Sequence, residues 1–185
     1  DTIVFYASNP AWSAAGTPSY HYIRAKEAGV KFITVDPIYT ASAQMLDAEW
    51  IPIRTGTDTA FLLGVASEMI RLDKAEGDIV DWEFLDKYTV GFDADHKPED
   101  LKEDVNFADY LEGKYDGVKH DAEWASAICG VPVEKITWFA REIGKKKNVW
   151  LLHNFAAARC DACENVPQLF MTLGAMGGHM GKPGN

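Results

Sequence analysis

The sequence predicts an α/β fold in which helices cover both faces of a doubly wound, mostly parallel sheet. Short continuous apolar runs, typical of strands buried on both faces, alternate along the chain with segments of helical periodicity. Each apolar run stops at a turn-forming residue, and strands that alternate with helices pair in parallel. With 185 residues, of which 47% are hydrophobic and 25% charged, the chain has the size and composition of one globular domain.

The first two predicted strands open the chain. Residues 2–7 form an apolar run that Ser8-Asn9-Pro10 interrupts, and residues 31–35 form a second run that ends at Asp36-Pro37. Residues 18–28 lie between these strands and predict a helix, because a proline suits its first turn and a glycine follows its end.

The same alternation continues. We expect a short helix at residues 40–45, a third strand at 48–53 and a long helix that begins at Asp58 and reaches about residue 72. Its apolar residues recur at helical spacing: Phe61, Leu62, Val65, Met69 and Leu72. A further short helix is expected at 81–88, with Asp81 as its cap.

Residues 91–120 differ from the rest of the chain. They are rich in acidic residues, lysine and glycine, with scattered aromatic residues, and predict an irregular excursion that its aromatic side chains pack against the domain. Regular structure then resumes with a helix at 121–129, a helix from Val131-Pro132 to about residue 143, a fourth strand at 148–153, a loop at 154–159 and a last helix at 161–176.

The overall charge limits the classes of partner. The formal net charge is −10, which argues against nucleic acid and anionic membrane surfaces as general partners. No apolar run in the sequence approaches the roughly 20 residues that a transmembrane helix needs.

The cysteines leave two interpretations open. Cys129, Cys160 and Cys163 are an odd number, which argues against a disulfide scaffold. Cys160 and Cys163 have Cys-x-x-Cys spacing, but a zinc or iron–sulfur site needs about four ligands and the sequence has no second pair. They are either two free thiols or a redox or metal pair.

Ligands of a Rossmann-like, doubly wound sheet bind at the carboxyl ends of its strands, where the strand order reverses. This rule selects four loops, at residues 8–16, 36–40, 54–58 and 154–159. None contains Gly-x-Gly-x-x-Gly or a Walker A sequence, and the chain has neither Gly-x-Ser-x-Gly nor His-Glu-x-x-His.

Three polar residues of these loops are candidates for nucleotide binding. Asn9 can bind a phosphate, a ribose or a neighbouring loop, or it simply forms the turn before Pro10. Asp36 can accept hydrogen bonds from ribose hydroxyls or guanine N–H groups, or it caps the next turn. Asp58 can accept from guanine, cap its helix, or do both.

Other residues of the third and fourth loops carry further expectations. Arg54 can bind a phosphate with two hydrogen bonds or form a surface ion pair. Gly56 and Thr57 allow a close approach to the backbone at a helix N-terminus, where anions bind. Arg159 follows an apolar loop, so it faces either a cofactor or anionic substrate, or solvent. His153 is expected to be a core histidine.

Several segments, taken in chain order, resemble the molybdopterin oxidoreductases of the dimethyl sulfoxide reductase family. The similar segments are Ser8-Asn9-Pro10, the Asp36-Pro37 turn, the run from Ile51 to Asp58, residues 84–93, Glu123-Trp124-Ala125, Gly130-Val131-Pro132, Ala140-Arg141-Glu142 and residues 178–184. The chain departs from the family pattern at Ile38, where arginine is common, at Thr55, which replaces proline, and in the loop at 153–159.

The resemblance implies a catalytic A subunit that uses a molybdenum (or tungsten) bis(molybdopterin guanine dinucleotide) cofactor, in a terminal reductase of anaerobic respiration. It implies that one dinucleotide contacts Ala7, Ser8, Asn9, Pro10, Asp36, Gly56, Thr57 and Asp58, and Arg54 is counted with them as a phosphate-binding candidate. It also implies that Phe155 and Arg159 approach the metal centre, where Arg159 orients an acceptor or tunes the centre.

The resemblance further implies that other parts of the enzyme lie outside this chain. We expect residues 1–185 to be a single internal domain excised from a longer protein, with the metal-ligating residue and an iron–sulfur cluster upstream and another pterin-binding domain downstream. The isolated domain is then expected to bind no complete cofactor and to be inactive. Expected partners are the other domains, an iron–sulfur electron-transfer subunit and a membrane anchor subunit, after export by the twin-arginine route.

Two other classes of function stay open at this stage. A non-catalytic nucleotide-binding or scaffold module of the same fold is compatible with the departures at Ile38 and Thr55. A dinucleotide dehydrogenase is disfavoured because its glycine fingerprint is missing.

Overall fold

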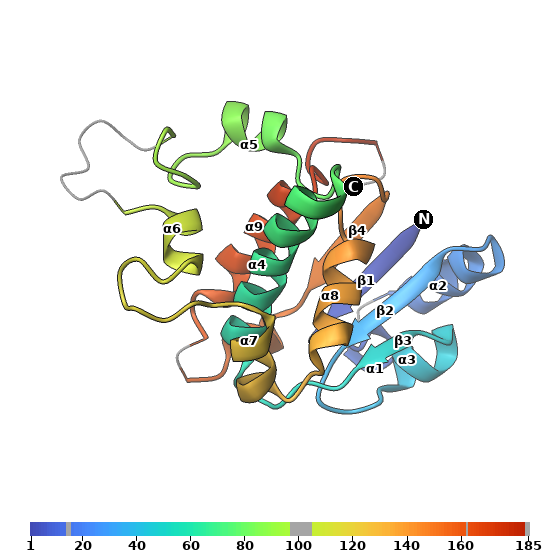
Figure 1. Cartoon of the computed structure of the whole chain (residues 1–185). Helices are drawn as coiled ribbons and strands as arrows, with labels where there is room; N and C mark the ends of the chain where they lie inside the picture. The colour runs from blue at the N-terminus through green and yellow to red at the C-terminus, as the bar shows by residue number, and fades with distance from the viewer. Residues whose placement is uncertain (14–15, 97–104, 162, 184–185) are drawn as a thin grey trace.

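The computed structural model describes residues 1–13, 16–96, 105–161 and 163–183. Within these residues it contains a four-stranded, entirely parallel sheet in the order β3-β2-β1-β4 (Figure 1). The strands are β1 (Thr2–Tyr6), β2 (Lys31–Val35), β3 (Glu49–Ile51) and β4 (Val149–His153). The predicted doubly wound α/β fold is therefore confirmed.

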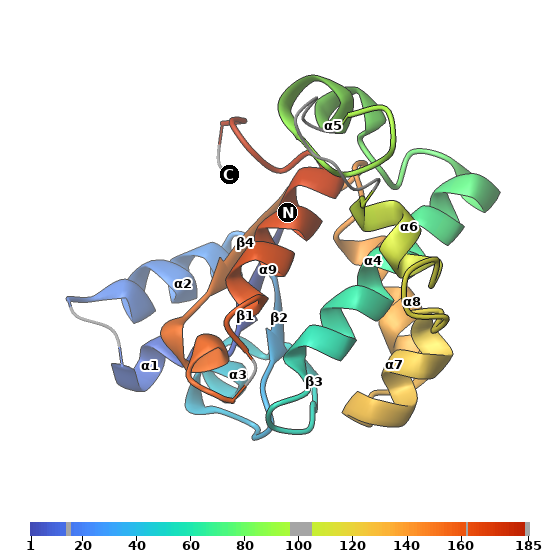
Figure 2. The ribbon, with the colours of Figure 1, turned by 90° about the vertical axis from the view of Figure 1, so that its left-hand side faces the viewer.

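Helices cover the sheet on both sides (Figure 2). The helices before β3 are α1 (Pro10–Ser13), α2 (Pro18–Glu27) and α3 (Ala41–Leu46). The later ones are α4 (Asp58–Glu76), α5 (Trp82–Tyr88), α6 (Phe107–Leu111), α7 (Ala122–Cys129), α8 (Val133–Glu142), the 3₁₀ helix η1 (Phe155–Ala158) and α9 (Val166–Met176).

The alternation of side chains along the strands divides the core into two layers. Ile3 and Phe5 of β1 pack with residues of α2 and α3, whereas Val4 and Tyr6 face the larger cluster built from α4, α7, α8 and α9. Successive strand residues point to opposite faces, so a strand covered on both sides must be apolar throughout. This explains why residues 2–7 form an uninterrupted apolar run.

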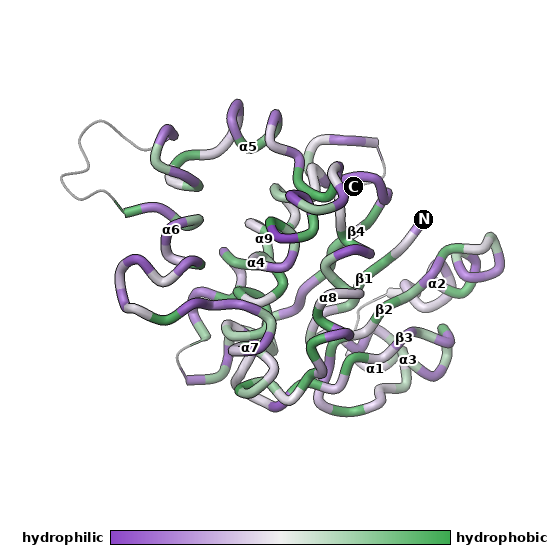
Figure 3. Tube along the Cα trace, in the orientation of Figure 1, coloured by the Kyte–Doolittle hydropathy of each residue, from purple (hydrophilic) through white to green (hydrophobic). Residues whose placement is uncertain are grey.

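Helix α4 is the centre of the larger layer. Its Phe61 ring lies 6.3 Å from the Tyr6 ring of β1 and 5.7 Å from the Phe139 ring of α8. The strands carry mainly hydrophobic residues, whereas the segment that follows α6 is largely hydrophilic (Figure 3). The contacts of Phe61 with β1 and α8 fix the position of α4, and with it the loop that precedes the helix.

Most of the expected elements are confirmed, and several ends differ for local reasons. β3 ends at Ile51, two residues early, because Pro52 cannot donate to a sheet ladder. α4 continues to Glu76 rather than stopping near residue 72. α9 begins at Val166, not at residue 161, with Pro167 in its first turn. α1 was not predicted.

The excursion at residues 91–120 is partly as expected. Its residues 97–104 lie outside the described part of the chain. Phe92 packs against Trp82 and Phe107, with ring centroids 5.9 and 5.8 Å apart, so aromatic packing is confirmed. The segment also contains α6, which was missed; its cap is Asn106, whose side chain accepts from the Asp109 N–H at 2.9 Å.

Candidate functional site at the carboxyl ends of the strands

The four predicted loops meet at one edge of the sheet. Tyr6, the last residue of β1, is level with Val35 of β2 and with His153 of β4, and Val35 is level with Ile51 of β3. β1 has β2 on one side and β4 on the other, so the chain turns in opposite directions from it. This is the switch point at which ligands bind in doubly wound sheets.

The first loop is held by its own polar side chain. Asn9 Oδ1 accepts hydrogen bonds from the Ser42 N–H at 3.2 Å and from the Ser42 hydroxyl at 2.7 Å. Ser42 Oγ in turn accepts from the Ala11 N–H at 2.9 Å. Ser8 is half-buried, and Pro10 is buried at the start of α1. Of the roles considered for Asn9, the structure contains the contact with a neighbouring segment, α3.

The second loop begins at Asp36, whose oxygen atoms accept hydrogen bonds that hold the turn. Its Oδ1 accepts from the Ile38 N–H at 3.1 Å, and its carbonyl oxygen accepts from the Trp50 indole N–H at 2.8 Å. The half-buried position of Asp36 raises the pKa of its carboxyl group, and the nearby Asp58 adds to that rise. The carboxylate stabilises the turn through one oxygen, as expected for a turn-capping aspartate.

The third loop leads into α4 and contains Asp58. Asp58 is the first helical residue and is only 7% exposed. Burial is the main cause that raises the pKa of its carboxyl group. Thr57 precedes the helix, and its hydroxyl donates to the Arg54 carbonyl oxygen at 2.7 Å. Gly56 has a positive φ of 78° and, among the described residues, an added Cβ would meet nothing within 4 Å.

Arg54 takes a role that neither sequence alternative included. Its guanidinium donates to the carbonyl oxygens of Ala127 at 3.2 Å and Ile128 at 3.1 Å, near the C-terminus of α7. Its backbone N–H donates to the Cys129 carbonyl oxygen at 3.0 Å. A cation satisfies the last carbonyl groups of a helix and complements its dipole. The expectation of a surface ion pair is replaced by this helix cap.

The fourth loop carries the most exposed candidates. Phe155, at the start of η1, is 75% exposed, and Arg159 is also exposed. For Arg159 this matches the solvent-facing alternative. His153 is exposed as well, and its ring forms a T-shaped pair with the Phe170 ring, with the centroids 5.2 Å apart. The expectation of a core histidine was wrong, because His153 ends β4, which lies at the edge of the sheet.

A buried polar cluster, missed by the sequence analysis, lies beneath these loops. Tyr6 is completely buried, and within the described residues its hydroxyl makes no hydrogen bond of ordinary geometry. Burial strongly raises the pKa of this hydroxyl, and the neighbouring Asp58, Cys129 and Cys163 raise it further. The only sequence sign was a tyrosine at the end of an otherwise apolar strand.

Two other kinds of feature are not found among the described residues. They contain no group of three or more His, Cys, Asp or Glu side chains arranged to hold a metal ion. No helix among them is both long and apolar enough to cross a membrane.

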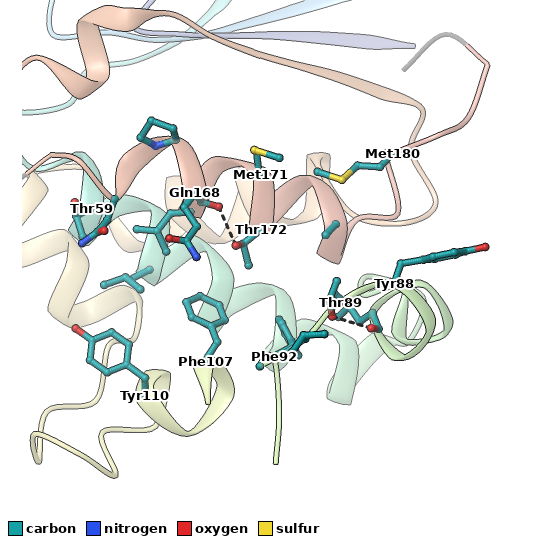
Figure 4. A pocket seen from close by; sticks show the side chains of 18 of the residues that line it. Thr59, Tyr88, Thr89, Phe92, Phe107, Tyr110, Gln168, Met171, Thr172 and Met180 are labelled. Carbon is teal, nitrogen blue, oxygen red and sulfur yellow. Dashed lines mark hydrogen bonds between the residues drawn. The ribbon is translucent and has the colours of Figure 1, made fainter. Parts of the chain in front are cut away.

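A large groove lies elsewhere. It has a volume of about 820 Å³ and runs between α9 and α4 on one side and α5, residues 89–92 and α6 on the other (Figure 4). Phe92, Phe107, Met171 and Met180 are among its mostly apolar lining residues, and no residue predicted to contact a nucleotide lines it. The strand-end loops therefore remain the candidate site for a polar ligand.

The arrangement at the strand ends suits a nucleotide. Asp36 and Asp58 offer carboxylate oxygens, which are acceptors only when ionised. The N-terminus of α4 offers backbone N–H groups and a positive dipole end, which favour an anion. Gly56 leaves open space for a ligand beside these groups.

Comparisons with known proteins show the family of the chain. Trimethylamine-N-oxide reductase of Haemophilus influenzae is 34% identical over 100% of the chain, and dimethyl sulfoxide reductase DmsA of Escherichia coli is 34% identical over 97% of it. The chain belongs to the dimethyl sulfoxide reductase family of molybdopterin oxidoreductases. It spans 21% and 22% of the length of these two relatives.

A solved structure supports the fold of this family member. Acetylene hydratase from Pelobacter acetylenicus superimposes on 98% of the chain, and on 22% of its own, with a TM-score of 0.72 and 20% identity. At this identity the likeness concerns the fold alone. No family model matches the chain.

Proposed function

We propose that this chain binds the guanine dinucleotide part of a molybdenum bis(molybdopterin guanine dinucleotide) cofactor, in a dimethyl sulfoxide reductase-like terminal reductase of anaerobic respiration. The observation that carries the proposal is the pair of carboxyl groups, Asp36 and Asp58, at the switch point beside the N-terminus of α4. Similarity to reductases over 97% or more of the chain supports the class of cofactor.

Asp58 is suited to bind guanine. The base offers two adjacent N–H donors on its Watson–Crick edge, and a carboxylate can accept from both. Burial raises the pKa of the Asp58 carboxyl group, so its charged form lacks full solvation in the free protein. Donors from the ligand would replace that solvation, because a buried charge is stabilised only when it is hydrogen-bonded.

The other loop residues would position the rest of the dinucleotide. Asp36 uses Oδ1 for the Ile38 N–H, which leaves Oδ2 to accept from a ribose hydroxyl. The backbone of Gly56 and Thr57 at the α4 N-terminus would meet a phosphate. Arg54 would add a positive charge beside that phosphate while it caps α7. Asn9 would act indirectly, by holding Ser8 and Pro10 against α3.

When bound, the molybdenum group supplies two-electron chemistry, and the protein contributes binding, orientation and electrostatics. In this chain the exposed Arg159 and Phe155 of the fourth loop would face the reacting end of the cofactor. The Arg159 guanidinium would orient a polar acceptor by hydrogen bonds. Replacing Arg159 with alanine in the full-length enzyme should lower kcat/KM, and unchanged activity would exclude this role.

The rest of the proposed enzyme lies outside this chain. It comprises the other domains, which would provide the metal ligand and an iron–sulfur cluster, together with an iron–sulfur electron-transfer subunit and a membrane anchor subunit. Export by the twin-arginine route is part of the same proposal. The isolated chain is expected to be inactive, because it would provide only part of the cofactor-binding surface.

Nucleotide binding by the 185-residue chain tests the first part of the proposal. GMP should bind more tightly than AMP in isothermal titration, because AMP lacks the paired N–H donors. Asp58→Asn should weaken GMP binding roughly 10- to 150-fold, the loss of about 1.5–3 kcal/mol expected for hydrogen bonds to a charged group. AMP binding should change little. Equal binding of GMP and AMP by the wild-type chain would refute the assignment of Asp58.

A second experiment distinguishes the enzyme from a scaffold of the same fold. The full-length protein would be purified without oxygen, from cells able to make the cofactor, and analysed for metals. Molybdenum equimolar with the chain, accompanied by iron, supports the enzyme. Absence of both metals would overturn it in favour of a non-catalytic module, whatever the nucleotide titration gives.

A further inference from the structure

Cys160 and Cys163 lie together in the turn that joins η1 to α9. Cys163 is only 1% exposed and belongs to the larger core cluster, while Cys160 is half-buried and packs against the same cluster. The Cys163 carbonyl oxygen accepts from the Val166 N–H at 3.1 Å, which ties this turn to the first residue of α9. The pair therefore combines one half-buried cysteine with one buried cysteine three residues further along the chain.

The surroundings of Cys163 favour its thiol form. Burial is the main cause that raises its pKa, and Asp58 and Cys160 raise it further. The influence of Cys160 reflects the close approach of the two side chains within the turn. Neither cysteine is in a disulfide in the structure described, and nothing in the proposed nucleotide site requires either sulfur.

The third cysteine provides an internal comparison. Cys129 is the last residue of α7 and is completely buried, and its carbonyl oxygen accepts from the Arg54 N–H at 3.0 Å. It has no cysteine neighbour within a few residues of sequence. Any reaction that needs both access to solvent and a second thiol close in the chain should involve Cys160 and Cys163 and spare Cys129.

We propose that Cys160 and Cys163 form a reversible disulfide by thiol–disulfide exchange with a low-molecular-weight disulfide. The accessible Cys160 thiolate attacks one sulfur of that disulfide, forms a mixed disulfide and releases one small thiol. Cys163 then loses its proton to solvent and attacks Cys160 Sγ, which releases the second small thiol. The two cysteines lose two electrons in total, and the small disulfide gains them.

The new bond would close a very short loop between η1 and α9. A cross-link mainly restricts the segment that it spans, here the turn next to Arg159. The disulfide would therefore restrict the end of the fourth loop. This inference is independent of the proposed function, because it needs only the two thiols and their positions.

Peptide mapping after equilibration in glutathione buffers tests the proposal. The folded chain would be incubated at several ratios of reduced to oxidised glutathione, quenched with acid, alkylated and digested with trypsin. Cleavage after Arg159 leaves Cys160 and Cys163 in one peptide that runs to the end of the chain, because the Lys182–Pro183 bond resists trypsin. Cys129 lies in a separate peptide, residues 120–135.

In oxidising buffer the peptide that begins at Cys160 should escape alkylation and be lighter by two hydrogen masses, while the Cys129 peptide stays alkylated. The oxidised fraction should follow the square of the reduced glutathione concentration divided by the oxidised concentration, as an internal disulfide requires. Cys129→Ala should give the same curve. Cys163→Ser should instead accumulate a glutathione adduct on Cys160.

Two results would overturn the proposal. One is a wild-type chain in which both thiols stay alkylatable at the most oxidising ratio, with its native circular dichroism spectrum retained. The other is stable glutathione attachment to Cys160 in the wild type, to the same extent as in Cys163→Ser, because it would mean that Cys163 cannot reach the mixed disulfide.

Discussion

Gly64 lies in α4 at the point where this helix crosses α7. A Cβ added at Gly64 would lie 2.4 Å from Ala125 Cβ, 3.4 Å from the Asp121 carbonyl oxygen and 3.7 Å from Ala122 Cα. Carbon atoms in contact are normally about 3.5–4.0 Å apart. Gly64→Ala should therefore force α4 and α7 apart, since neither Cβ can rotate away from the other.

The size of the effect follows from two opposing terms. Overpacking a tight core costs about 1–3 kcal/mol, and the upper end applies because both atoms are fixed to helix backbones. Alanine is better than glycine in a helix interior by about 1 kcal/mol. The net prediction is a loss of about 2 kcal/mol in the free energy of unfolding, which lowers Tm by roughly 4–8 °C in a chain of this size.

Gly174→Ala is the matched control. Gly174 is also inside a helix, α9, but among the described residues its added Cβ would meet only Met180 Cε at 3.5 Å and Leu151 Cδ1 at 3.6 Å. The propensity term then acts alone, and Gly174→Ala should stabilise the protein by about 1 kcal/mol. The change in unfolded-chain entropy is common to both variants, so the difference between them isolates the steric cost.

Urea titration followed by tryptophan fluorescence would measure these free energies, with Trp124 on α7 as a nearby reporter. The same substitution is also made in an Ala125→Gly variant of the protein. Once Ala125→Gly removes the opposing methyl group, Gly64→Ala should become stabilising, which reverses its sign. The reasoning fails if Gly64→Ala is neutral or stabilising in the wild-type background, or if its sign is the same in both.

Two further variants test polar groups of the core. Buried Glu68 accepts from Arg71 Nε and Nη2, both at 2.8 Å, and from the Thr137 hydroxyl at 2.7 Å. Glu68→Gln should therefore lower the free energy of unfolding by about 1–3 kcal/mol. Thr137→Val is the control and should lower it by less in the same urea titration. His179 is buried, and its Nε2 lies 2.8 Å from the Ile143 carbonyl oxygen. Burial lowers the pKa of His179 below 6.5, so its contribution to the free energy of unfolding should be complete above that pH and decline below it. His179→Gln should flatten this part of a plot of the free energy of unfolding against pH.

Elements bounded by strong local residues were predictable from sequence. β2 has the expected limits, because Gly29 precedes it and Asp36-Pro37 follows it. α7 begins after its cap, Asp121, and stops at Gly130, whose φ is 76°. In both cases residues within a few positions decide where the element ends, so no knowledge of the tertiary fold is needed.

The partners of the site residues were less predictable, because they come from distant parts of the chain. Arg54 caps a helix more than 70 residues further on, and Asn9 bonds a serine 33 residues away. The same reasoning missed Tyr6, since an aromatic strand residue is usually a core residue and nothing nearby in sequence indicates Asp58 beside its hydroxyl. Local patterns select loops, but packing decides which partners their side chains meet.

These long-range contacts bear on how the strand-end site would function. Asn9 fastens the first loop to α3, the Trp50 indole fastens the second loop to β3, and Arg54 fastens the third loop to α7. Each contact is a hydrogen bond that joins a loop to a separate helix or strand. The three loops are therefore positioned by the packed layers beneath them. A ligand then meets carboxylates and N–H groups whose places are already fixed, and less of the binding free energy is lost in ordering them. The fourth loop is fastened to β1 at its start, where the Asn154 N–H donates to the Tyr6 carbonyl oxygen at 3.2 Å, so a bond between Cys160 and Cys163 would act on its other end, next to Arg159.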